Sequence, residues 1–333
     1  MVTTPEELSE LTKERSMGAL GNETADREIR RIDLSNFEER RAEIAEEIWG
    51  AARQIGFFQI YNHGIVPDLQ QAAFALSKQF FALPEQLKAR YPLVRSLNAG
   101  WESRSQVRPS IATPDDKESY QITRPHMQDR WPSQEELAGF SATMLAFEAQ
   151  CWQVAMRVLS CFAEKLGFHR GFFTEAHDPA EPGYQSTLRL LHYFSGEPDN
   201  AEGALRWRAG AHTDFDCLTL LFQQDGQGGL QVCPGLEADA QEWTPIEPSS
   251  ETITCNIGDM LMRWSDNQLP SNFHRVKSPG PEDSRGDRYS IAFFAQANRH
   301  VVIRGPQALH PEITAAEYLA QRVQANYGAG PGT

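Results

Sequence analysis

The 333-residue chain has no long hydrophobic run and no excess of basic residues. No apolar stretch approaches the roughly 20 residues that a helix needs to span a bilayer. The N-terminal segment MVTTPEELSELTKERSMG is too polar for a signal peptide. The 31 basic residues face 45 acidic ones, giving a net charge of −14, and no basic stripe is visible. Such a surface repels phosphate backbones, so we expect a protein that binds neither nucleic acid nor membrane.

Cysteine is also scarce. The chain has an odd number of cysteines and no C-x-x-C spacing: Cys151, Cys161, Cys217, Cys233 and Cys255. Four of the five lie inside apolar helix or strand patterns. This arrangement favours buried, reduced thiols over a disulfide framework or a zinc site. We therefore expect a cytoplasmic protein.

The first half of the chain is predicted to be mainly helical. Residues 1–28 are polar and lack a sustained period, which predicts a mobile tail. Apolar residues three and four apart predict helices over about 38–54 and 67–81, with short strands at 32–34 and 57–61. A capping-box pattern, Ser133 with Glu136, predicts the start of a long helix that continues to about Leu166. Residues 92–132 are rich in Pro, Ser and Arg and predict a long loop, in which Trp101 and residues 117–120 are candidates to border a pocket.

From residue 187 the pattern changes to short β-strands separated by Gly-rich or Pro-rich turns. Strands are expected at 188–194, 218–222, 230–232, 252–257, 260–264, 273–277 and 289–295. Many short strands at this spacing predict a sandwich or barrel, and eight antiparallel strands in two sheets would form a jelly roll. A last helix, capped by Thr314 and Glu317, is expected to reach about Tyr327. The predicted fold class is α+β, mainly β: a double-stranded β-helix (jelly-roll) core braced by N-terminal and central helices.

The segment Gly210-Ala211-His212-Thr213-Asp214-Phe215-Asp216 is the first candidate site. In an extended chain alternate side chains share a face, so His212 and Asp214 could grip one metal ion. With a second His they would form the 2-His-1-carboxylate triad of non-haem Fe(II) oxygenases, which leaves open coordination positions. A His-x-acid triplet alone is weak evidence, because a second one, His310-Pro311-Glu312, also occurs. Asp216 shares the same face and is the obvious rival ligand.

Three further features strengthen the assignment. His274 lies in a strand pattern, where a ligand from the opposite sheet of a jelly roll would have to be. Arg288 and Ser290 point to one face of the next strand and could hold a carboxylate by charge-assisted hydrogen bonds. Tyr193, on the 188–194 strand, could reach the same carboxylate.

The order and spacing of these features resemble the isopenicillin N synthase-like Fe(II)/2-oxoglutarate oxygenases from Ile32 to about Tyr327. The resemblance is carried by IDLSNF, AARQIGFFQIYNHGI and FFALPEQLK, and then by LRLLHYF, GAHTDFDCLTLLFQ, GGLQV, NIGDMLMRWSDNQLPSNFHRVKSP and RYSIAFF. It implies a division into a tail (1–28), an N-terminal helical and strand region of the oxygenase (29–130), and one catalytic unit. That unit (131–328) comprises the long helix, the jelly-roll core and the C-terminal helix.

The resemblance also implies roles for individual residues. The metal ligands fall on His212, Asp214 and His274, and the family pattern favours Asp214 over Asp216. The carboxylate clamp for 2-oxoglutarate falls on Arg288 and Ser290, supported by Tyr193. Family members often read Asn-Tyr-Tyr where this chain has Leu191-His192-Tyr193, so an Asn that usually helps to hold the co-substrate is missing.

Within the family, KESYQI, LRLLHYF, AHTDF and RYSIAFF are most similar to thymine 7-hydroxylase-type members. In a relative of that type a Tyr follows the His-x-Asp, whereas this chain has Phe215, so thymine itself does not follow as the substrate. Arg189, Phe294 and Trp101 are further candidates for substrate contact, and Phe215 joins them. An Arg among aromatic residues suits a planar or anionic compound.

The implied enzyme is a dioxygenase that uses Fe(II), 2-oxoglutarate and O2. It would couple decarboxylation of 2-oxoglutarate to succinate with oxidation, by hydroxylation, of a small organic molecule, nucleobase-like or otherwise planar. One alternative is an iron-dependent oxidase of the same fold that does not use 2-oxoglutarate, and another is a non-catalytic jelly-roll binding protein. We expect a small-molecule substrate as partner, and a monomer or weak homo-oligomer.

Overall fold

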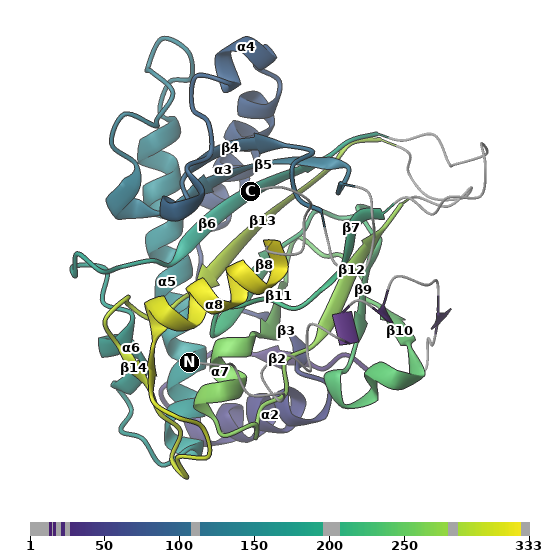
Figure 1. The fold of residues 1–333 in the computed structure, drawn as a ribbon, viewed down its shortest axis with the longest axis vertical. Helices are drawn as coiled ribbons and strands as arrows, with labels where there is room; N and C mark the ends of the chain where they lie inside the picture. Colours follow the sequence, from purple (N-terminus) through teal and green to yellow (C-terminus); the bar gives the residue numbers. More distant parts are fainter. Residues whose placement is uncertain are drawn as a thin grey trace.

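The core consists of two β-sheets that face each other (Figure 1). The computed structural model describes residues 13, 14, 16, 17, 21–23, 27–107, 114–195, 207–278 and 286–327. The major sheet has the order β2 (Arg31–Asp33), β3 (Phe57–Tyr61), β11 (Ile253–Ile257), β8 (Leu218–Phe222), β13 (Arg288–Ala295), β6 (Thr187–Tyr193), β5 (Lys117–Ile122) and β4 (Gly100–Ser103). The minor sheet has the order β1 (Asn22–Glu23), β10 (Glu242–Pro245), β9 (Leu230–Cys233), β12 (Phe273–Lys277) and β7 (Trp207–His212).

Neighbouring strands pair antiparallel except at β1–β10 and β2–β3, where the pairing is parallel. A small hairpin, β14 (Val302–Ile303) with β15 (Ile313–Thr314), lies outside both sheets. The expected α+β fold with a jelly-roll core is confirmed.

Strand β13 shows why the two faces of the major sheet differ. Successive side chains alternate between the faces of a strand. Ile291, Phe293 and Ala295 belong to the large apolar core that contains the helices. Ala292 belongs instead to a second apolar cluster, which includes Leu230 and Val276 of the minor sheet and so fills the space between the sheets. One face of β13 therefore anchors the fold, and the other is available for a site.

Helices cover the outer face of the major sheet. Helix α5 (Phe140–Lys165) packs against β8 and β13, and α2 (Arg41–Gln54) and α3 (Pro67–Phe81) pack against α5. Three further helices are short: α4 (Glu85–Lys88), α6 (Phe172–Ala176) and α7 (Asp259–Trp264). The described residues also form the 3-10 turns η2 (Arg95–Leu97), η3 (Arg124–His126) and η4 (Gly235–Ala240). Helix α8 (Ala315–Tyr327), yellow in Figure 1, lies on the opposite side of the major sheet from α5.

Several predicted elements need correction. The expected loop at 92–132 contains β4 and β5, which extend the major sheet at one edge. Residues 260–264 form helix α7 and not a strand, because a short apolar run has no period long enough to decide between the two. The long helix begins at Phe140: Ser133 and Glu136 do form the capping box, but Gly139 at φ 73° separates that turn from the helix. The predicted tail lies mostly outside the described residues, although Asn22–Glu23 pairs with β10.

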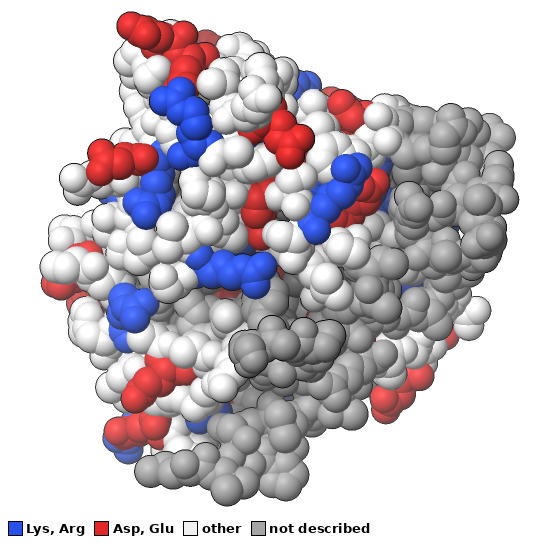
Figure 2. Space-filling model, turned by 45° about the horizontal axis from the view of Figure 1, so that its top comes forward, with Lys and Arg blue, Asp and Glu red and all other residues white. Residues whose placement is uncertain are grey.

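The surface shows no strong segregation of charge on the face in view. Blue and red side chains are interspersed there among uncharged ones (Figure 2). Among the described residues, no helix is both long and apolar enough to cross a bilayer. The expectation that the chain does not bind nucleic acid stays a prediction.

Candidate metal centre and cavity

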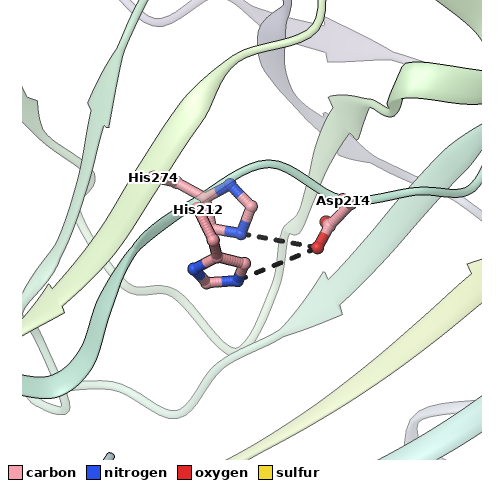
Figure 3. Close-up of side chains that lie close together, drawn as sticks. All are labelled: His212, Asp214 and His274. Carbon is pink, nitrogen blue, oxygen red and sulfur yellow. Dashed lines mark ion pairs between the residues drawn. The ribbon is translucent and has the colours of Figure 1, made fainter. Parts of the chain in front are cut away.

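His212 and His274 are brought together by strand pairing. His212 ends β7, His274 is the second residue of β12, and the two are direct partners in the antiparallel pairing. Their ring centres lie 4.2 Å apart. Asp214 follows two residues after His212, and its Oδ1 lies 3.9 Å from His212 Nε2 and 3.7 Å from His274 Nε2 (Figure 3).

These three ligand atoms lie within 4.8 Å of one another, and no other group of His, Cys, Asp or Glu side chains in the described ranges has this geometry. The two separations to Asp214 are smaller than twice the bond of about 2.1 Å that a divalent ion such as zinc makes to a His nitrogen. One ion could therefore bridge Asp214 and either imidazole, and the two imidazole ligand atoms lie within 4.8 Å of each other. Two nitrogens and one carboxylate oxygen are the donor set that suits Fe(II).

Hydrogen bonds fix the direction in which two of these side chains present their ligand atoms. Nδ1 of His212 lies 2.8 Å from the carbonyl oxygen of Gly210. Because a carbonyl only accepts, Nδ1 carries the proton and Nε2 keeps its lone pair. Asp214 Oδ2 accepts from Thr219 Oγ1 at 2.6 Å and from Asn256 Nδ2 at 2.9 Å, so Oδ1 is the oxygen left for a metal.

Asp216, the rival ligand, is not part of this group. Strand β7 ends at His212, so the extended alternation that would align Asp216 with His212 stops there. The Asp216 side chain is fully buried against the backbone of Gly258. Burial, followed by the nearby charge of Asp214, raises the pKa of Asp216 well above its usual range. The second triplet is no metal site either: His310 contacts Asn267, and Glu312 pairs with Arg304 on the surface.

A cavity of about 250 Å³ lies in front of the triad, between the two sheets. Its walls include the three candidate ligands, Thr219 and Asn256. Helix α8 contributes Leu319 and Val323. The site thus has a protein side, where the ligands are held, and an open side, where small molecules can bind.

Arg288 and Tyr193 lie in this cavity, next to each other across β13 and β6. Arg288 is 2 % exposed, and its guanidinium carbon lies 4.7 Å from the centre of the Tyr193 ring. Its Nε donates to the carbonyl oxygens of Gln227 and Gly228, and Nη1 lies 3.4 Å from Ser290 Oγ. Burial lowers the pKa of Arg288, while Tyr193 opposes that shift.

Nη2 of Arg288 is buried and has no hydrogen-bond partner within the described part of the chain. A buried guanidinium with an unused donor suits a carboxylate ligand. At the position where relatives often have Asn, the apolar Leu191 lines the cavity. His192 points to the other face of β6, where its Nδ1 lies 2.8 Å from Glu118 Oε1.

Three of the four predicted substrate-contact residues line the same cavity: Arg189, Phe294 and Phe215. The guanidinium carbon of Arg189 lies 5.0 Å from the centre of the Phe294 ring, within the range of a cation–π contact. Trp101 does not line the cavity. Its indole donates to Glu118 Oε2 at 2.7 Å, and the ring packs against the helix-side core, so the structure gives no support for a substrate contact by Trp101.

The sequence did not single out the residues that hold the site from behind. Thr219 and Asn256 bind Asp214, and Glu102 and Gln121 lie in the cavity wall next to Arg189. Asn256 lies in the NIGDM motif, whose position in the family pattern was the one available signal. Gln121 follows directly after the KESY segment, but only strand pairing shows that it lies beside Arg189.

Residues 185–297 match the 2OG-Fe(II) oxygenase superfamily, and residues 29–139 match the non-haem dioxygenase in morphine synthesis N-terminal family. The chain is 31% identical to the 2-oxoglutarate-Fe(II) type oxidoreductase hxnY of Emericella nidulans, over 86% of this chain and 86% of that protein. It is also 31% identical to the proline hydroxylase buaE of Petromyces alliaceus, over 90% of this chain and 100% of that protein.

A similar solved structure is the full-length thymine 7-hydroxylase of Neurospora crassa in complex with alpha-KG (2-oxoglutarate) and thymine. The two chains share 32% sequence identity, and the superposition has a TM-score of 0.78. It covers 89% of this chain and 96% of the Neurospora chain.

Proposed function

This chain belongs to the 2OG-Fe(II) oxygenase superfamily, and from that premise we propose that it hydroxylates a small, planar, nucleobase-like molecule held in the cavity. The superfamily uses Fe(II), 2-oxoglutarate and O2, so the chain is a 2-oxoglutarate-dependent dioxygenase. The observation that carries the proposal is the convergence of His212, Asp214 and His274 at one point of the cavity wall. A fully enclosed metal would have no room for reactants.

The proposed ligand atoms for Fe(II) are Nε2 of His212, Nε2 of His274 and Oδ1 of Asp214. When bound, Fe(II) and 2-oxoglutarate activate O2, and the co-substrate loses CO2 to become succinate while a substrate C–H bond is oxidised. The protein contributes position and shielding. Thr219 and Asn256 hold Asp214 from one side, and Gly210 holds the His212 ring in the tautomer that leaves Nε2 free.

The proposed partners for the distal carboxylate of 2-oxoglutarate are Arg288 and Ser290, with Tyr193 beside them. Arg288 supports this role because it is buried, charged and has an unused N–H donor at the cavity. Its two backbone contacts, to Gln227 and Gly228, fix the plane of the guanidinium. A clamp with a fixed plane can make a two-pronged contact with a carboxylate.

The proposed substrate contacts are Arg189, Phe294 and Phe215. The Neurospora thymine 7-hydroxylase structure in complex with thymine supports a nucleobase-like substrate. In this chain Phe215 is beside the guanidinium of Arg322, 5.7 Å from the ring centre. The rings of Phe215 and Phe294 can pack against the face of a flat molecule, and Arg189 can bind a polar group at its edge.

Three further features stay proposals. We propose that residues 29–130 form the N-terminal region and residues 131–328 the catalytic unit. The family match at 185–297 lies within the second unit, and the match at 29–139 covers the first and extends slightly past its end. We also propose a monomer or weak homo-oligomer that works in the cytoplasm. The location is supported by the five cysteines, which are all buried free thiols.

The direct test is turnover with a compound panel. The protein is loaded anaerobically with Fe(II) and 2-oxoglutarate, then exposed to air with nucleobases, amino acids or phenolic acids, and succinate and O2 uptake are measured. We expect at least one planar compound to give one succinate per oxidised product. His212→Ala and Asp214→Ala should fold but form no succinate. Product without succinate would support the oxidase alternative, and no O2 uptake with any compound would support the binding protein.

The clamp has its own test. Arg288→Lys keeps the charge but cannot make the two-pronged contact, and the loss of one charge-assisted hydrogen bond costs about 1.5–3 kcal/mol. The concentration of 2-oxoglutarate needed for half-maximal succinate formation should rise by at least about tenfold. Arg104→Lys, at an exposed position, serves as the control. An unchanged saturation curve for Arg288→Lys would remove Arg288 from the co-substrate site.

A further inference from the structure

Two cavity residues on neighbouring strands carry unused polar atoms of opposite kinds. Gln121 of β5 and Arg189 of β6 are direct partners in the antiparallel pairing, and both line the cavity. Gln121 is fully buried, and its Oε1 accepts no hydrogen bond from the described residues. Nε of Arg189 is buried in the same way and donates to none of them. An acceptor and a donor therefore lie on neighbouring strands of the cavity wall, each without a hydrogen-bond partner among the described residues.

The orientation of the Gln121 amide follows from its neighbour Glu102. Nε2 of Gln121 donates to Glu102 Oε1 at 2.8 Å and to Ser119 Oγ at 3.1 Å. An ionised carboxylate only accepts hydrogen bonds, so the amide nitrogen must face Glu102 and the amide oxygen must face away.

Glu102 is held in its ionised form. Burial alone would raise the pKa of Glu102, but the charge of Arg189 and hydrogen bonds such as that from Ser105 outweigh it and hold the pKa below its usual value. Gln106 adds a hydrogen bond to Oε1 at 2.5 Å.

Two basic residues in this part of the cavity, Arg189 and Lys117, each have an acidic neighbour. Arg189 lies in the field of Glu102, and the nearby Lys117 forms a buried ion pair of 2.6 Å with Asp115. A carboxylate bound beside Arg189 would add a negative charge to a neutral group of residues, next to Glu102. Because a carboxylate has no N–H, it would also leave the buried Gln121 oxygen without a hydrogen-bond donor, and an unsatisfied buried acceptor weakens binding. This wall thus favours a neutral ligand that has both a donor and an acceptor.

We propose that Gln121 and Arg189 together determine substrate specificity, and that the substrate is a neutral cyclic amide. Its ring N–H donates to Gln121 Oε1, and its adjacent C=O accepts from Arg189. The ring lies along Phe294, whose strand neighbour Thr219 binds Asp214. In the major sheet β13 lies between β6, which carries Arg189, and β8, which carries Thr219, so these two strands are about 10 Å apart. A substrate with one ring and a substituent is long enough to reach from Arg189 to the metal centre. The inference rests on the proposed function and narrows its substrate class.

A binding experiment tests this class without turnover. The probes are 2-pyridone, which has the N–H next to C=O, N-methyl-2-pyridone, which lacks the N–H, and benzoate, which is an anion of similar size. Dissociation constants are measured by ligand-detected NMR on the protein loaded with Zn(II) and 2-oxoglutarate. We expect 2-pyridone to bind at least about tenfold more tightly than either of the other two. Equal affinity for the two pyridones, or tighter binding of benzoate, would overturn the proposal.

Variants assign the effect to the named residues. Gln121→Leu should reduce the affinity for 2-pyridone to that for N-methyl-2-pyridone, while Arg189→Met should weaken both. Glu102→Gln is the sharpest test. The new amide at position 102 can donate a hydrogen bond to the Gln121 oxygen, so the Gln121 amide can rotate by 180° and point its nitrogen into the cavity. The same variant removes the negative charge beside Arg189. The binding preference should therefore shift from 2-pyridone towards the anion benzoate. Gln71→Leu, on the exposed face of α3, is the matched control and should change nothing.

The outcome is separable from that of the proposed function. Succinate formation with some panel compound, combined with no preference among the three probes, would overturn only the cyclic-amide proposal. A clear preference for 2-pyridone with no succinate from any compound would overturn the catalytic proposal and leave the recognition proposal intact. If Gln121→Leu does not fold, as judged by circular dichroism, the three probes on the unmodified protein still decide the question.

Discussion

At the scale of single residues, the two oxygens of Asp214 have different surroundings. Oδ2 receives hydrogen bonds from Thr219 and Asn256, whereas Oδ1 faces the two imidazoles. Because Thr219 belongs to β8 and Asn256 to β11, the carboxylate is held by two strands of the major sheet although it is itself in a loop. Partners behind a metal ligand in general raise affinity by restricting its orientation.

Removing these partners should weaken metal binding without removing a ligand. We expect Thr219→Val or Asn256→Ala to lower the affinity for a divalent ion by about 10–100-fold. Titration with Co(II), followed by its visible absorption, measures the change. Thr254→Val is the control, because Thr254 is on the same strand as Asn256 but contacts Gln59 and Gln223. If Thr219→Val and Asn256→Ala bind Co(II) as tightly as Thr254→Val does, the hydrogen bonds to Asp214 do not contribute to metal binding.

Some of these residues could be predicted from the sequence and some could not. His212 and Asp214 are two positions apart, so their proximity is a local property of the chain. His274 could be proposed because a family pattern supplied its distance along the chain. Gln121 could not, because its environment depends on which strand β5 pairs with, and that register is set by contacts far apart in the sequence.

At the scale of secondary-structure elements, α8 is tied to the loop that carries the candidate ligands. Arg322 of α8 forms a buried ion pair with Asp259, the first residue of α7. Asp259 Oδ2 also accepts from Thr213 Oγ1 at 3.0 Å, and Thr213 lies between His212 and Asp214. The helix that lines one wall of the cavity is therefore coupled to the metal-binding loop through a single carboxylate.

Breaking this pair should cost much more than breaking a surface pair. Arg322→Met leaves the Asp259 charge buried without its cation, which costs about 3–5 kcal/mol in the free energy of unfolding. Arg304→Met, which breaks the exposed pair with Glu312, should cost less than about 1 kcal/mol.

Urea unfolding measures both variants. The double variant Arg322→Met/Asp259→Asn should recover part of the loss, because it no longer buries an unpaired charge. A stability of Arg322→Met within about 1 kcal/mol of the unmodified protein would show that Asp259 is compensated by other groups.

The elements that the sequence predicted best are those with a long or repeated pattern. Helix α3 has the predicted bounds, as do β3, β8 and β12. Helix α7 was predicted as a strand because five residues hold too few turns to show a helical period. Strand β5 was missed because it is buried on both faces and so lacks the alternation of a half-exposed strand. Strand β4 is an edge strand of only four residues, too short to show a period.

At the scale of the whole molecule, two histidines buried away from the metal centre affect stability. Burial, with the charge of Arg157, lowers the pKa of His63 to about 4, and burial lowers the pKa of His177 to about 4. His63 Nδ1 accepts from the backbone N–H of Ile65, so protonation would remove an acceptor. His177 Nδ1 donates to the carbonyl of Phe173 and so needs no second proton. Both side chains are therefore neutral in the folded protein.

This neutrality makes folding sensitive to mild acid. An unfolded histidine takes up its proton near pH 6.5, whereas the folded protein takes it up only near pH 4. The unfolded state thus binds more protons between these values, and stability is lost as the pH falls below about 6.5. Above that pH the two histidines are neutral in both the folded and the unfolded state, so they do not change the free energy of unfolding with pH. At pH 5 each should lower the free energy of unfolding by on the order of 2 kcal/mol.

The double variant His63→Asn/His177→Asn tests this assignment, because Asn can replace the acceptor at position 63 and the donor at position 177 without binding a proton. Its free energy of unfolding, measured in urea at pH 7.5 and pH 5, should fall with acid by about 4 kcal/mol less than that of the unmodified protein. His169→Asn, at an exposed position, should retain the full acid sensitivity. An equal loss of stability in the double variant and the unmodified protein would assign the acid sensitivity to carboxylates, which must then be protonated before the fold is lost.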